Sequence, residues 1–70
     1  MMIPTATMRT LIKTQTGLRA GTTTAEELAY QLEQVAKTII GHAEKLARHN
    51  GRVTIQPEDI LLAVELLEEE

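Results

Sequence analysis

Residues 45–64 read KLARHNGRVTIQPEDILLAV, and this stretch decides the fold. It begins as a helix that Asn50 and Gly51 end, because glycine tolerates the left-handed backbone of a helix C-terminus and asparagine nearly does. The β-branched residues 53–55 favour an extended backbone. Pro57 then suits the first position of a new helix, where its missing N–H is not needed. The stretch therefore predicts a helix end, a loop with a short extended piece, and a helix start.

Charges at the two ends of this loop predict a pair that holds it closed. Arg52 follows the helix stop, and Glu58 and Asp59 open the next helix, where negative charge suits the positive end of the helix dipole. Because the loop folds back between these positions, Arg52 and Asp59 can meet. If the pair is partly buried, removal of one partner would leave an uncompensated charge, so we interpret it as structural.

Three helices are expected, over residues 5–15, 24–49 and 57–67. The first carries an apolar stripe at helical spacing, formed by Ala6, Met8, Leu11 and Ile12. A run of threonines precedes the second. Thr23 with Glu26, or Thr24 with Glu27, matches a capping box, in which hydroxyl and carboxylate each bond to the other residue's amide.

The central helix is too long and too apolar for its own chain to cover. Its 26 residues would extend about 39 Å, and each flanking helix is about a third of that length. Its apolar positions, wider than a surface-helix stripe, are Ala25, Leu28, Ala29, Leu32, Val35, Ala36, Ile39, Ile40, Ala43, Leu46 and Ala47. A second copy crossing near the small residues Ala36 and Gly41 would cover them. A coiled-coil hairpin is the alternative, but no strict heptad continues into the third helix. We therefore expect an intertwined dimer with little stable monomer.

Composition leaves few other ways to stabilise the chain. Its 70 residues make a single domain, 1–70, and a chain of that size buries only about 60% of its unfolded surface. Cysteine, Phe and Trp are absent, and Tyr30 is the one aromatic residue, so oligomerisation is the remaining way to enlarge the core. No apolar run approaches the ~20 residues that span a bilayer, and the N-terminus lacks a signal-peptide pattern. We expect an intracellular, cytoplasmic protein with no membrane partner.

The net charge of −3 hides a polarity along the chain. Residues 1–24 contain Arg9, Lys13 and Arg19 and no acid, whereas no base follows Arg52 and the C-terminus carries Glu65, Glu68, Glu69 and Glu70. A basic surface favours phosphate, so the N-terminal third is the candidate binding region. The alternatives remain open that these cations are simply solvated and that the glutamates form a solvated tail, repel DNA or favour a basic partner.

The short, long and short helices, with the pattern KLARHNGRVTI-x-x-EDI-x-LAV at 45–64, resemble the archaeal histones, the tailless relatives of the eukaryotic core histones. IP-x-A at 3–6 and the R-x-x-x-K spacing of Arg9 and Lys13 also fit. The resemblance covers nearly all of the chain. It implies an all-α histone fold that binds double-stranded DNA non-specifically on the chromosome (nucleoid) and wraps it as dimers, tetramers or longer arrays. A homodimer and a heterodimer with another histone-fold chain both remain possible.

The resemblance also assigns roles to DNA-binding residues. Arg19, in the first loop, resembles the arginine that enters the minor groove, where a narrow groove attracts a planar guanidinium. Thr54 resembles the residue whose hydroxyl and amide meet phosphate beside that arginine, on the partner chain. Arg9 and Lys13 resemble backbone contacts of the first helix. Arg52 is counted with the DNA-binding residues as well as with its internal partner.

A second set of residues resembles the four-helix contact through which two dimers meet: Leu46, His49, Asp59 and Leu62. For His49 three roles are open: a satisfied helix-end histidine, a donor to Asp59 of a neighbouring dimer, and a metal ligand. His42 lies about 10 Å away along the helix and no third ligand is apparent, which disfavours the metal. We expect no metal site and no cofactor.

Three departures from the archaeal pattern bear on function. Val53 and Gln56 stand where lysine is usual, the tail is acidic where it is often basic, and Thr16 stands where glycine is common and bears on the stacking of dimers. Each lost lysine flattens the salt dependence of DNA binding by ~0.9. The alternative function is therefore a histone-fold interaction module with weak or no DNA binding. An enzyme is not expected, because the sequence has no Gly-rich phosphate loop, nucleophile elbow or metal triad.

Overall fold

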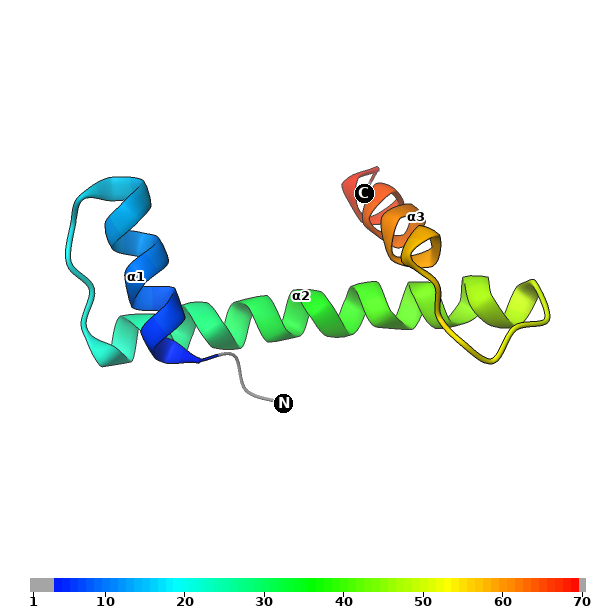
Figure 1. The fold of residues 1–70 in the computed structure, drawn as a ribbon, viewed down its shortest axis with the longest axis horizontal. Coiled ribbons are helices and arrows are strands. Elements are labelled where there is room, and N and C mark those ends of the chain that lie inside the picture. The colour runs from blue at the N-terminus through cyan, green and yellow to red at the C-terminus, as the bar shows by residue number, and fades with distance from the viewer. Residues whose placement is uncertain (1–3, 70) are drawn as a thin grey trace. The chain divides into compact units, whose positions relative to one another are not determined.

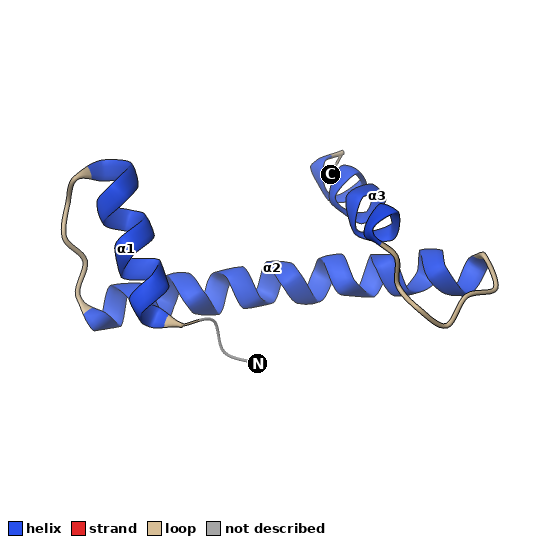
Figure 2. Ribbon diagram, in the orientation of Figure 1, coloured by secondary structure: helices blue, strands red, loops and turns tan. Residues whose placement is uncertain are grey.

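The computed structural model describes residues 4–69, and this part of the chain consists of three α-helices (Figure 1). They are α1 (Thr5–Thr16), α2 (Thr22–His49) and α3 (Pro57–Glu68). No strand occurs within residues 4–69 (Figure 2). The predicted all-α class and the order of a short, a long and a short helix are confirmed.

Two glycines in left-handed backbone follow the ends of α1 and α2. Gly17 has φ 75° and donates its N–H to the carbonyl of Lys13 at 2.8 Å. Gly51 has φ 72° and donates its N–H to the carbonyl of Arg48 at 3.0 Å. Side chains other than glycine rarely adopt this backbone, so these glycines stop the two helices as the sequence predicts.

The start of α2 differs from the prediction. The helix begins at Thr22, so Thr23 and Thr24 lie inside its first turn and neither can be its N-cap. The predicted capping boxes are therefore wrong. Gly21 precedes the helix, and its carbonyl accepts the first intrahelical bond, from the N–H of Ala25 at 3.1 Å. Glycine is an acceptable N-cap, which leaves the threonines free to continue the helix.

The second loop also differs in part. Residues 53–55 were expected to be extended, but positions 53 and 54 form a bend and no strand is present there. A strand needs a neighbour to satisfy its backbone, and residues 4–69 contain none. Extended backbone occurs at Gln56, with φ −98° and ψ 160°, because the residue before a proline avoids helical angles. Pro57 then begins α3, as predicted.

The chain divides into two compact units at the middle of α2, residues 1–34 and 35–70. In the first unit the buried core is Met8 from α1 against Ala25 and Ala29 from α2, with Leu28 packed beside them. Of the stripe predicted on α1, Ile12 is half-buried, Ala6 and Leu11 are exposed, and only Met8 is buried. In the second unit the buried residues are Ala43, Ala47, Asp59 and Ala63.

The largest apolar side chains lie outside this core. Among residues 4–69 the exposed ones are Leu11, Leu18, Tyr30, Leu32, Val35, Ile40, Val53, Ile55, Ile60, Leu61, Leu62 and Leu66. The buried apolar residues of the same part of the chain are five alanines and one methionine. An exposed apolar surface of this extent is unusual for a protein that acts alone. The described part of the chain contains no helix suited to cross a membrane.

Candidate nucleic-acid interface

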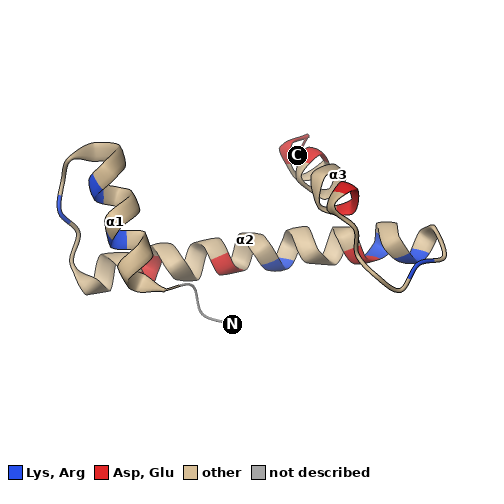
Figure 3. Cartoon of the chain, in the orientation of Figure 1, with Lys and Arg blue, Asp and Glu red and all other residues tan. Residues whose placement is uncertain are grey.

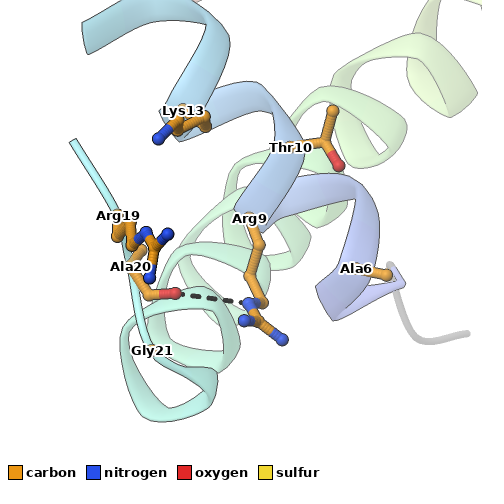
Figure 4. Close-up of a pocket in the computed structure, with 7 residues that line it drawn as sticks. All are labelled: Ala6, Arg9, Thr10, Lys13, Arg19, Ala20 and Gly21. Atoms are coloured by element: carbon orange, nitrogen blue, oxygen red, sulfur yellow. Dashed lines mark hydrogen bonds between the residues drawn. The ribbon is translucent and has the colours of Figure 1, made fainter. Parts of the chain in front are cut away.

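Three cationic side chains of the first unit share one open hollow of about 680 Å³, between α1 and the loop that follows it (Figure 4). Its lining residues are Ala6, Arg9, Thr10, Lys13, Arg19, Ala20 and Gly21. Arg9 and Lys13 are four residues apart and so share a face of α1, while the loop brings Arg19 opposite them. No acid lines the hollow, and Figure 3 shows α1 and this loop free of red. The arrangement suits an anionic ligand.

Hydrogen bonds from α1 hold the loop that carries Arg19. The Thr16 hydroxyl donates to the carbonyl of Ile12 at 2.8 Å and accepts the N–H of Leu18 at 3.0 Å. Further along the loop, Nε of Arg9 donates to the carbonyl of Ala20 at 3.2 Å (Figure 4). Sequence reasoning missed both contacts. A threonine bonding four residues back is a recognisable signal, but nothing in the spacing indicates a bond across eleven residues.

In the second unit, Arg52 and Asp59 form a two-pronged pair. Nη1 of Arg52 donates to Oδ2 of Asp59 at 2.6 Å, and Nη2 donates to Oδ1 at 2.8 Å. Nη1 also donates to the carbonyl of Thr54 at 3.2 Å, and the N–H of Gln56 donates to Oδ2 at 2.8 Å. Asp59 is 1% exposed. This parallel geometry is the strongest form of an Arg–carboxylate contact, and it fixes the path of residues 52–59.

The pair changes the protonation behaviour of both partners. The guanidinium bonds from Arg52, helped by the N–H of Gln56, lower the pKa of Asp59 to about 2 despite its burial. The hydrogen bond to Asp59 in turn raises the pKa of Arg52. The two side chains therefore stay charged and paired through the neutral range.

The remaining predicted DNA-binding residue, Thr54, has an exposed side chain, while its carbonyl is held by Arg52. Arg52 is half-buried, and its two terminal nitrogens are engaged within the chain. Arg19 belongs to the first unit and Thr54 to the second. Their expected proximity, which involves two chains, stays a prediction.

The residues predicted for the contact between dimers all lie in the second unit. His49 and Leu62 are exposed and Leu46 is half-buried. Asp59 is buried, and both of its oxygens accept hydrogen bonds within the chain. A contact from His49 of another dimer would have to reach it beside Arg52. Within residues 4–69 no group of three histidine, cysteine or acidic side chains is placed to hold a metal.

Comparison with known proteins identifies the family. The model of the core histone domain, which describes the four core histones together, matches residues 3–66. The chain belongs to the core histone family. It is also similar to an archaeal protein, the "DNA-binding protein HmvA" of Methanocaldococcus jannaschii, with 36% identity over 59 residues. That alignment covers 84% of this chain and 62% of the relative, so the chain spans about 62% of the length of the curated protein it matches.

These matches bear on the sequence interpretation. The resemblance to archaeal histones, which depends mainly on residues 45–64, is confirmed. The family match runs from the IP-x-A segment into α3, and it therefore includes both loops and the whole of α2.

The Arg52–Asp59 pair predicts an acid-sensitive fold. Because the pKa of Asp59 is lowered from 3.8 to about 2, the pair contributes stability that is complete above the unfolded value and is lost as the pH falls through about 2. The free energy of unfolding, measured by urea titration, should drop steeply between about pH 4 and pH 2. In Asp59→Asn it should be lower at neutral pH and less steep over the same window. Glu58→Gln removes a carboxylate from the same turn and is the matched control. Parallel curves for wild type and Asp59→Asn would contradict this role.

Proposed function

We propose that the chain is a histone that binds double-stranded DNA without sequence preference, as a dimer. The observation that carries this proposal is the cationic hollow, in which Arg9, Lys13 and Arg19 converge without an acid among the lining residues. Phosphate contacts from such side chains supply most of non-specific DNA binding. The name of the archaeal relative, a DNA-binding protein, supports the same function.

The proposed dimer follows from what one chain leaves uncovered. Along α2, Leu32, Val35 and Ile40 are exposed although they belong to the apolar side of the helix. A second copy crossing at α2 would bury them. Nothing in the chain lies within 4 Å of the place where a Cβ on Gly41 would be, so a second backbone could approach closely there. Burial of this surface would supply the stabilisation that one chain lacks.

In such a dimer each DNA-facing site would combine loops of two chains. Arg19 of one chain would lie beside Thr54 of the other, with Arg9 and Lys13 adding phosphate contacts from α1. Arg52, with its terminal nitrogens engaged by Asp59, would mainly set the position of Thr54. Exposed His49 and Leu62 with half-buried Leu46 would join dimers into tetramers or arrays, which would bend DNA along the chromosome.

A histone-fold interaction module is the second candidate. Val53, at a position where a lysine would contact phosphate, is 99% exposed and apolar. The C-terminal part of α3 carries Glu65 and Glu68, both exposed, and no base in its last turn. Such a chain could pair with a more basic histone-fold protein and contact DNA weakly or not at all.

DNA binding is tested with Arg19→Ala. Loss of this contact from both chains of a dimer should reduce the slope of log affinity against log salt by about 1.8 and weaken binding roughly tenfold on every sequence tried. Fluorescence anisotropy with labelled duplexes gives both quantities. Lys37→Ala, which removes the same charge from an exposed position of α2, is the control and should keep most of the affinity. If the wild type forms no complex with DNA at low salt and micromolar dimer, the proposed function is wrong.

The dimer is tested with two matched charge insertions in α2. Val35 is 44% exposed on the apolar side of the helix, and Tyr30 is 55% exposed on its polar side. In Val35→Glu a charge would be buried between chains, so we expect loss of the dimer and of helicity together. Tyr30→Glu should remain a folded dimer. Sedimentation equilibrium and circular dichroism at micromolar concentration report both properties. A folded monomeric wild type would refute the dimer.

A further inference from the structure

The loop that carries Arg19 needs to be held in place from outside. It runs from Gly17 to Gly21, and glycine at both ends gives its backbone more freedom than other residues would. Arg19 lies at its centre, and its side chain is exposed. A long side chain on a loose loop loses conformational entropy when it binds, which weakens the contact. What fixes this loop therefore affects how well Arg19 can bind.

The structure fixes both neighbours of Arg19. On one side the N–H of Leu18 is bonded to the Thr16 hydroxyl at 3.0 Å. On the other side the carbonyl of Ala20 is bonded to Nε of Arg9 at 3.2 Å. Both groups belong to side chains of α1, so the helix holds the loop at two points with Arg19 between them.

We propose that Arg9 is a positioning residue for Arg19: by holding Ala20 it directs the Arg19 side chain into the cationic hollow, where DNA would bind. This role rests on the proposed function. It differs from a plain phosphate contact, because it depends on the Nε donor of Arg9 and not only on its charge. Its charge still contributes to the field of the hollow, beside Lys13.

Arg9→Lys separates the two roles. The change keeps the positive charge but places a methylene where arginine has Nε, so the bond to Ala20 is lost. If Arg9 serves only as a charge near phosphate, Arg9→Lys should bind DNA like the wild type. If Arg9 positions Arg19, binding should weaken by about three- to tenfold while the salt slope changes little. Arg48→Lys, the same substitution at an exposed position of α2, is the control.

Two further variants sharpen the DNA measurement. Thr16→Val removes the other tie to the loop without any change of charge, so it should also weaken binding at an unchanged salt slope. In an Arg19→Ala background, Arg9→Lys should cause no further loss, because there is then no side chain to position. Multiplicative losses in the double variant, or wild-type affinity in Arg9→Lys, would overturn the proposal.

A measurement without DNA tests the positioning itself. Backbone ¹⁵N relaxation should give the Arg19 amide an order parameter of about 0.85 in the wild type, falling to about 0.6 in Arg9→Lys. The Arg48→Lys control should leave it unchanged. An unchanged order parameter in Arg9→Lys would show that Arg9 does not hold the loop, whether or not DNA binds. If the loop loosens as expected but the wild type binds no DNA, the proposed function fails, and with it the DNA role of Arg9.

Discussion

The buried apolar core of one chain is made almost entirely of alanine. Across residues 4–69 it consists of Met8 and five alanines, while larger side chains such as Val35 and Ile40 remain exposed. Alanine lets helices approach closely but removes little apolar surface from water, so each contact contributes little stability. A chain of 70 residues is already marginal in the surface it can bury. The rest of the account depends on this deficit, because the fold has to be completed from outside the chain.

Both loops are held by side chains of the helices next to them. In the second loop, Arg52 and Asp59 close the path with two short bonds, and burial of Asp59 makes the pair costly to break. In the first, Thr16 and Arg9 bond the residues on either side of Arg19. Each loop thus presents an exposed side chain, Thr54 or Arg19, from a backbone that is fixed by hydrogen bonds.

Local signals allowed much of the fold to be predicted from the sequence. Glycine in left-handed backbone and proline at a helix start act within a few residues, and Gly17, Gly51 and Pro57 lie where such signals place them. The start of α2 was mispredicted because Thr23 and Thr24 match a capping pattern while Gly21 supplies the turn. The extended piece at residues 53–55 needs a neighbouring strand that the described part of the chain does not contain.

The candidate site was predictable in composition but not in detail. The charge polarity of the sequence indicated Arg9, Lys13 and Arg19, and the structure brings them to one hollow. The bond from Arg9 to Ala20 depends on how the loop returns along α1, which no local pattern encodes. Such contacts can be recognised only when the tertiary path of the loop is known.

The most direct test of the central claim is the salt dependence of DNA binding by the wild-type dimer. Three cations from each of two chains would make about six contacts, so the slope of log affinity against log salt should be about −5. A slope close to zero, or no measurable complex at low salt with micromolar dimer, would contradict the account of this chain as a DNA-binding histone.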